Sequence, residues 1–394
     1  MVKLKRHIKG LKQWFTILIA GLVLVAALAD ILANDKPLVS SDEDGVSFPV
    51  FQQMGIDLGV IQPPLGFVGT DWQGKAYRWV VWAPVPYSPG SFDRRNKHFV
   101  SPLDKQDVES IRFRHWLGTD LLGRDVLSGL IHGTRMALLV GFFSVLISGL
   151  LGLLLGAFSG YFGNQGLKTS WWIMIAGLFW LFAGLYLGHY SDLVSLSLGW
   201  WIIWAVGFVL WFFMLPQAKG TVQIPIDGIV LRLMELIQSV PGLLVLMTVL
   251  ALVQKPGTWT VVLVIGLLSW PGVARFARAE MLKVRSMTFM DATRVMGMSH
   301  FQIIMRHGMV NIFGSVTVIL AFNFAGAILA ESALSFIGVG LDPSEVTWGN
   351  MLNAARTQPS AWWVAVFPGV LLFLTILSLN RLGSAWEKSR GVVL

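Results

Sequence analysis

Runs of apolar residues long enough to cross a bilayer recur along this chain. A transmembrane helix needs about 20 predominantly apolar residues. Short polar stretches separate most of the runs, and a much longer polar stretch, residues 34–133, follows the first. The pattern predicts an all-α polytopic membrane protein with eight spans, near residues 14–33, 134–158, 170–190, 197–215, 228–253, 258–276, 312–336 and 361–382.

Composition supports a membrane protein and argues against other classes. Charged residues make up 13% of the 394 residues and hydrophobic ones 55%, whereas soluble domains carry about 25% charged residues. The net charge of +8 does not indicate nucleic-acid binding, because basic residues gather at the N-terminus and in short loops between spans. The chain has no cysteine, which excludes disulfides, zinc fingers and thiol nucleophiles.

The distribution of charge predicts the orientation. Basic residues dominate the stretch 275–307 and the tail 387–394, whereas the loop after Phe336 is acidic. Cytoplasmic loops carry the excess of Lys and Arg, and an even number of spans places both termini in the cytoplasm. Residues 1–33 then form a basic head and a membrane anchor. Ala27-Leu28-Ala29 resembles a signal-peptidase site, but the apolar run exceeds the usual 7–15 residues of a signal peptide, which favours an anchor.

The polar stretch 34–133 is rich in acidic residues, Pro, Gly and Trp. Its aromatic content predicts a small folded cap with short strands, on the outer side of the membrane. In the span that follows (134–166), five small residues recur every four positions. They favour close packing of helices over a ligand groove: Ser144, Ser148, Gly152, Gly156 and Gly160.

The most informative polar stretch is residues 287–311, MTFMDATRVMGMSHFQIIMRHGMVN, within a predicted cytoplasmic loop at about 284–311. It indicates two short helices broken at Gly297, with Ser299 as the N-cap of the second. Phe301, Ile304 and Met305 would form one apolar face, opposite Gln302 and Arg306. An amphipathic element of this kind either docks into a groove on a partner protein or lies on the lipid surface, and periodicity does not separate the two.

This stretch resembles the EAA loop of ABC-importer permeases, whose pattern is Glu-Ala-Ala, three residues, then Gly. Asp291, Ala292, Thr293 and Gly297 occupy those positions, and Arg306-His307 with Asn311 resembles the ending found in peptide permeases. Asp291, Thr293 and Val310 depart from the usual Glu, Ala and Pro. In that family the loop is the coupling helix, which seats in a cleft of the ATPase subunit.

Four further stretches resemble the C-type permease of dipeptide and oligopeptide importers. They are WLGTDLLGRDVLS (116–128), WPGVAR (270–275), ILAESALSFIG (328–338) and WGNM (348–351). Residues 33–38 and 79–84 are similar to permeases of the microcin C and oligopeptide group. The resemblance implies a type I importer core over residues 223–386, transporting peptides across a bacterial inner membrane. It also implies as partners a second homologous permease, two ATPase subunits that bind the ATP and Mg, and an extracytoplasmic binding protein.

One region departs from that family, whose members usually have six spans. Residues 167–222 read as an inserted two-helix hairpin carrying seven of the 18 Trp residues. A lipid-facing hairpin with an aromatic belt is the favoured interpretation, and a docking surface for another subunit is the alternative.

Ionisable and polar residues within the spans are candidates for the substrate path, because burying charge in lipid is costly. Arg232, Glu235 and Gln238 recur every three residues, so they either pair with one another or line the path. Asn323 and Glu331 share a face of a later span, and Glu331 near its end is expected to be solvated or to cap. Pro241 predicts a kink.

No enzyme motif was found. The chain lacks a phosphate-binding Gly-x4-Gly-Lys-Ser/Thr loop, His-Glu-x-x-His and Gly-x-Ser-x-Gly. The histidines (His132, His189, His307) lack metal-ligand spacing, so we predict no catalytic residue, cofactor or metal in this chain. Two alternatives from other classes, a proton-coupled transporter and a membrane-embedded enzyme, find little support, since few charges lie mid-span and no repeat is evident. Within the permeases, nickel chelates are the alternative substrate to peptides.

Overall fold

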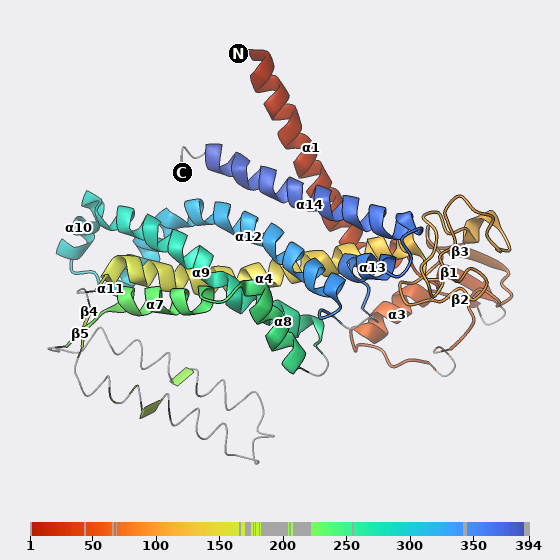
Figure 1. The fold of residues 1–394 in the computed structure, drawn as a ribbon, viewed down its shortest axis with the longest axis horizontal. Coiled ribbons are helices and arrows are strands. Elements are labelled where there is room, and N and C mark those ends of the chain that lie inside the picture. Colours follow the sequence, from red (N-terminus) through yellow and green to blue (C-terminus); the bar gives the residue numbers. More distant parts are fainter. Residues whose placement is uncertain are drawn as a thin grey trace. The chain divides into compact units, whose positions relative to one another are not determined.

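The computed structural model is mostly helical (Figure 1). It describes residues 2–42, 45–64, 67, 69–164, 167–169, 222–253, 256–341 and 345–389, together with eight isolated positions between 175 and 207. Within these residues, four helices are long and apolar enough to cross a membrane, or five if one broken helix pair counts as a span. The predicted spans 170–190 and 197–215 lie outside the described residues, apart from those isolated positions.

The N-terminal helix α1 (Val2–Ala27) starts within the basic head and ends before the predicted limit at residue 33. A break at Leu28 separates it from the short α2 (Ala29–Leu32). Two residues after the break, Asp30 forms an ion pair with Arg135 at 2.7 Å. The same arginine donates to the carbonyl of Ala26 at 3.0 Å, so the end of α1 is held by a side chain from a later helix.

The polar stretch after α2 folds into short strands, as predicted. Strands β1 (Pro37–Asp42), β2 (Gly45–Ser47) and β3 (Trp79–Trp82) form an antiparallel sheet in the order β2-β1-β3. Helix α3 (Pro49–Asp57) follows β2, and a 3₁₀ turn η1 (Ile111–Phe113) precedes the first long span. We call residues 34–125 the cap.

Helix α4 (Val126–Phe162) starts earlier than the predicted span at residue 134. The carboxylate of Asp125 accepts from the backbone N–H of Ser128 at 2.6 Å and so caps the helix. The predicted packing role of its small residues is confirmed. A β-carbon added at Gly152 would lie 2.5 Å from that of Val273. Only glycine therefore lets α4 approach the later helix so closely.

Two short strands join the ends of the predicted insertion. β4 (Leu167–Thr169) pairs antiparallel with β5 (Val222–Ile224). The isolated positions also link its two arms, because the indole of Trp180 donates to the carbonyl of Trp204 at 3.3 Å and the indole of Trp204 donates back at 3.1 Å.

The next span is broken at Pro241, where the sequence predicts a kink. Helix α7 (Ile226–Gln238) ends before Pro241, and α8 (Gly242–Leu252) begins after it. Pro241 has an extended ψ of 123°, and proline cannot donate to the preceding turn, so one helix ends before it and a new one begins after it. Helix α9 (Thr258–Arg285) then continues past the predicted end at residue 276.

The remaining elements follow the predicted order. A short helix α10 (Thr288–Val295), a single turn α11 (His300–Gln302) and a π-helical stretch η3 (Ile303–Gly308) lead into the long α12 (Met309–Ile337). Helix α13 (Trp348–Ala355) and the terminal α14 (Trp362–Ser389) complete the chain. Helix α14 packs against both α13 and α1.

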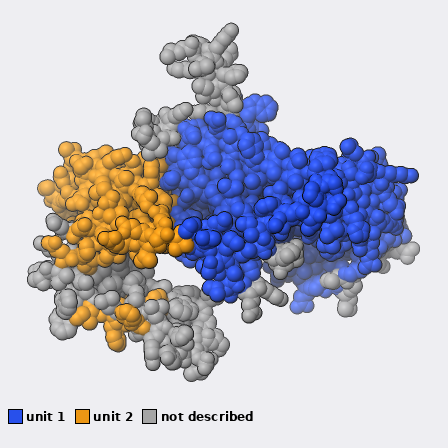
Figure 2. Space-filling model, viewed as in Figure 1, with its two compact units in different colours: residues 1–148, 241–269, 317–394 blue, residues 149–240, 270–316 orange. Residues whose placement is uncertain are grey.

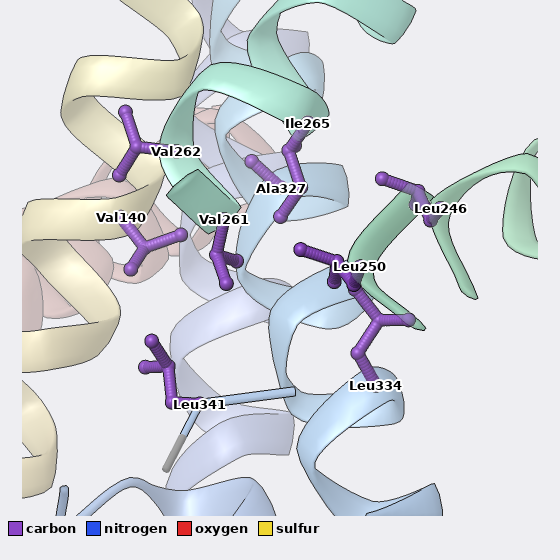
Figure 3. Packing of buried hydrophobic residues seen from close by; sticks show 9 residues of the cluster. All are labelled: Val140, Leu246, Leu250, Val261, Val262, Ile265, Ala327, Leu334 and Leu341. Carbon is purple, nitrogen blue, oxygen red and sulfur yellow. The ribbon is translucent and has the colours of Figure 1, made fainter. Parts of the chain in front are cut away.

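The chain divides into two compact units, coloured separately in Figure 2. Unit 1 comprises residues 1–148, 241–269 and 317–394, and unit 2 comprises residues 149–240 and 270–316. Figure 3 shows a core of unit 1, to which α4, α8, α9 and α12 contribute aliphatic side chains. One hydrophobic cluster of unit 2 contains Val230, Met234, Trp270 and Ala274.

Candidate functional site

The 284–311 segment, which joins α9 to α12 in unit 2, has the local structure that the sequence predicts. Helix α10 ends at Val295, and Gly297 adopts a φ of +76° with open space around it. Its backbone N–H donates to the carbonyl of Arg294 at 3.0 Å, which closes the last turn. A positive φ of this kind favours glycine, which explains why the two helices break there.

The second helix starts with a capping box. The Ser299 hydroxyl accepts from the backbone N–H of Gln302 at 3.3 Å, and the Gln302 side chain accepts from the backbone N–H of Ser299 at 3.2 Å. The prediction of Ser299 as N-cap is confirmed. Arg306 and His307 lie in η3, where the His307 carbonyl accepts from Asn311 at 2.7 Å.

The predicted apolar face of this second helix is wrong in part. Ile303 and Ile304 are fully buried, whereas Phe301 and Met305 are each 37% exposed. The π-helical stretch Ile303–Gly308 explains the difference. Its wider turn shifts the angular position of the side chains relative to an α-helix, so a period of 3.6 residues misplaces the face.

The segment has one face packed on unit 2 and one face open. Met290 and Thr293 of α10 are buried, and the Thr293 hydroxyl donates to the Met290 carbonyl at 2.8 Å. At the turn, Val295 is 88% exposed and Met296 is 68% exposed. Large apolar side chains this exposed beside a fixed turn are suited to contact with another surface.

The polar residues of α10 lie at the same open end. Ala292 is exposed, and the carboxylate of Asp291 accepts from Arg294 at 2.7 Å, an ion pair between residues three apart on the helix. The structure thus places the predicted Asp291, Ala292 and Gly297 on the open face and Thr293 on the packed face. Sequence reasoning missed Val295 and Met296, although two apolar residues directly before a helix-ending glycine would have been the signal.

The second predicted set, on α7, separates into two interactions. Arg232 and Glu235 form an exposed ion pair at 2.7 Å, which is the structural alternative foreseen for them. Gln238 instead accepts a hydrogen bond from Arg275 of α9. The three residues therefore do not act as one cluster.

Of the two candidates on α12, Glu331 is buried and Asn323 is half-buried. Glu331 is only 1% exposed, so the expectation that it is solvated is wrong. Its carboxylate accepts from Ser335 at 2.8 Å and from Ser332 at 3.3 Å. The amide nitrogen of Asn323 is buried with no hydrogen-bond partner among the residues the structure describes.

Sequence reasoning missed an ion pair at the start of α7. Arg278 of α9 donates to both carboxylate oxygens of Asp227, and the Ser159 hydroxyl of α4 donates to the same carboxylate at 2.6 Å. The interaction joins α4, α7 and α9 within unit 2. An acidic residue in the first turn of an apolar helix was the available signal, but its partners are distant in sequence.

A buried histidine in the cap was also missed. The imidazole of His115 lies between two carboxylates, 2.8 Å from Asp125 and 3.1 Å from Asp93, and its ring stacks on Tyr87. Burial alone would lower the pKa of His115, but the hydrogen bonds to Asp125 and Asp93 outweigh it and raise the pKa above its ordinary value of 6.5.

The same interactions act on Asp93 in the opposite direction. Burial by itself would raise the pKa of Asp93, but hydrogen bonds from His115, Asn96 and the backbone N–H of Arg95 lower it to about 2. The cap thus places a histidine whose raised pKa favours the imidazolium between two carboxylates, just before α4.

The long apolar helices define a polytopic membrane protein, and the 284–311 segment lies between two of them, α9 and α12. Comparison with known sequences gives the family. The family described as "Binding-protein-dependent transport system inner membrane component" matches residues 223–389. A Brucella suis protein whose name describes a peptide permease is 32% identical over 274 residues, covering 69% of this chain and 70% of that protein.

Two further relatives are similar over the same extent. The glutathione transport system permease protein of Pectobacterium atrosepticum is 29% identical over 270 residues, covering 68% of this chain and 69% of its own. The dipeptide transport system permease protein of Bacillus subtilis is 27% identical over 275 residues, covering 69% of this chain and 67% of that protein. The chain therefore belongs to the inner membrane permease subunits of binding-protein-dependent ABC importers. Such subunits are multi-pass and work with separate ATPase subunits and a binding protein, without an ATPase site or cofactor of their own.

Proposed function

We propose that this permease transports peptides, and that the 284–311 segment is where it receives the ATPase. The names of the relatives support the substrate class, because peptides, glutathione and dipeptides share a peptide backbone. Nickel chelates, the alternative substrate, find no support among these three names.

The observation that carries the docking proposal is the open end of the 284–311 segment. Val295 and Met296 present apolar surface at a turn whose backbone is fixed by Gly297 and whose packed face is buried. A helix lying on lipid would have to turn this apolar surface toward the bilayer, level with the ends of the apolar spans. A protein groove accepts a small apolar tip flanked by the ion pair of Asp291 and Arg294. Ser299 caps the start of the second half of the segment, and Arg306 and His307 lie in the η3 stretch that follows it.

The proposed topology places the segment in the cytoplasm and the cap outside. Both termini are cytoplasmic in this arrangement, and residues 167–222 add two spans to a six-helix core, giving eight. The antiparallel pairing of β4 with β5 supports an insertion whose two ends meet. The pathway would form between this chain and a second, homologous permease, above two ATPase subunits.

Transport would follow ATP-driven closure of the ATPase pair, which would move the docked segment and reorient the spans. Of the path candidates, Arg232 and Glu235 remain exposed in this chain and Gln238 is hydrogen-bonded to Arg275. Glu331 and the amide nitrogen of Asn323 are buried here, so these groups would contact substrate only in a different conformation of α12.

Uptake by the reconstituted importer tests the substrate class. The complex of this chain with its co-expressed permease, ATPases and binding protein is placed in liposomes, and uptake of labelled trialanine is measured with and without ATP. We expect ATP-dependent uptake that unlabelled di- and tripeptides reduce and a nickel–histidine chelate does not. Uptake of the nickel chelate in place of the peptide would contradict the proposed substrate class.

A further inference from the structure

Helix α4 is not adjacent in sequence to the 284–311 segment, which follows α9 and precedes α12. Movement of the segment reaches α9 and α12 through the continuous chain. It reaches α4 only through noncovalent contacts. One route to α4 runs through its close packing on α9 at Gly152, and the other runs through its direct contacts with the segment.

Within unit 2, the contacts converge on the last turn of α4. A hydrogen bond of 2.9 Å joins the Tyr161 hydroxyl to Nδ1 of His300, the first residue of α11. The imidazole also packs edge-on against the rings of Tyr161 and Phe162, with centroids 5.7 and 5.6 Å apart. One turn earlier, the ring of Phe158 lies 6.5 Å from that of Phe301.

Tyr161 also contacts the other half of the segment. The guanidinium of Arg294, at the end of α10, lies 5.8 Å from the centre of the Tyr161 ring. The same arginine pairs with Asp291 at 2.7 Å. One side chain of α4 thus contacts α10 through Arg294 and α11 through His300, on both sides of the Gly297 turn.

The tyrosine side of the joint is buried, whereas His300 is exposed. Tyr161 is 4% exposed with His300 in place. Losing a buried hydrogen bond leaves the group unsatisfied, which costs more than the bond contributes. The capping box on Ser299 fixes the backbone of the neighbouring His300.

We propose that the Tyr161–His300 hydrogen bond is the joint through which movement of the 284–311 segment reaches α4. Both residues are then positioning residues for coupled transport. The proposal rests on the docking role assigned to the segment above. It predicts that breaking the joint leaves the ATPase bound and active but makes hydrolysis less productive.

The test measures two quantities on the full complex: the amount of ATPase that co-purifies, and the trialanine taken up per ATP hydrolysed. Tyr161→Phe removes one oxygen and keeps the ring. His300→Phe keeps an aromatic ring and removes the nitrogen. We expect each variant to retain the ATPase and to lower uptake per ATP about two- to tenfold, the range given by one hydrogen bond.

The double variant and a matched control make the result specific. The two changes break the same bond, so the double variant should be little worse than either single one. Tyr77→Phe removes a comparable hydrogen bond, from a hydroxyl to the Trp72 carbonyl at 2.8 Å in the cap, and should leave uptake per ATP unchanged.

Three outcomes would contradict the proposal that the Tyr161–His300 hydrogen bond is the joint. Normal uptake per ATP in Tyr161→Phe with the ATPase bound would refute it directly. Multiplying losses in the double variant would show that the two residues act independently. If the wild-type chain itself retained no ATPase, the docking role would fail and the proposed joint with it. The amount of co-purified ATPase separates this outcome from the other two.

Discussion

The buried histidine of the cap gives a prediction whose size follows from the structure. As an imidazolium, His115 donates to two carboxylates, Asp125 at 2.8 Å and Asp93 at 3.1 Å, with its side chain fully buried. In His115→Asn the shorter amide can satisfy at most part of this arrangement and carries no charge. A hydrogen bond to a charged group contributes about 1.5–3 kcal/mol, and removing one partner of a buried pair costs about 3–5 kcal/mol. We expect the opening free energy of the cap to fall by about 3 kcal/mol.

The pH dependence gives a second measure of the same group. The pKa of His115 is raised in the folded protein, so its contribution is complete below about pH 6.5 and is lost as pH rises through the folded pKa. The pKa of Asp93 is lowered to about 2, so its contribution is complete above its ordinary value of 3.8 and is lost as pH falls through about 2. The cap should therefore be most stable between these limits, near pH 4 to 6.5.

Thiol protection measures the opening of the cap. The chain has no cysteine, so Ser40→Cys introduces a single thiol at a fully buried position of β1. Its labelling rate at several denaturant concentrations gives the opening free energy. His98→Asn is the matched control, because His98 is exposed and has a positive φ that asparagine tolerates. Equal labelling in both variants, or a wild-type cap equally stable at pH 6 and pH 9, would refute the proposed imidazolium.

Three further predictions address docking, packing and topology. Val295→Asp places a charge on the exposed tip of the 284–311 segment and should lower co-purified ATPase about tenfold, whereas unchanged binding would show that the tip makes no contact. Gly156→Leu puts a side chain 2.8 Å from a neighbouring β-carbon and should destabilise the detergent-solubilised protein by about 1–3 kcal/mol in thermal unfolding, whereas Gly326→Leu has open space and should not. An impermeant maleimide added to intact cells should label Ser110→Cys but not Ser286→Cys, both of which replace exposed serines, and the reverse pattern would invert the proposed orientation.

The sequence predicted those features whose causes are local. The break at Gly297 and the cap at Ser299 depend on residues within one helical turn, where glycine and serine have known preferences. The ridge of small residues on α4 follows from spacing alone, and the packing at Gly152 confirms it. The short strands of the cap followed from composition in the same way.

The features that could not be predicted depend on distant partners or on departures from ideal geometry. Tyr161 and His300 are 139 residues apart, and Asp227 and Arg278 are 51 apart. No periodicity connects such pairs. The π-helical stretch 303–308 shifts the buried face of its helix. The prediction missed this shift because it assumed the regular period of an α-helix. Glu331 was expected to be solvated from its place near a helix end, but two neighbouring serines bury and satisfy it.

The most direct test of the docking role is co-purification of ATPase subunits with the tagged chain carrying Gly297→Asp. Gly59→Asp in the cap is the matched control, because both glycines have a positive φ, +76° and +71°, and neither has an atom within 4 Å of an added β-carbon. The backbone strain is thus the same in both, and only the position of the new charge differs. We predict that wild type and Gly59→Asp retain the ATPase and that Gly297→Asp loses it while still folding. Equal retention by both variants, or no retention by wild type, would contradict the assignment of the 284–311 segment as the docking element.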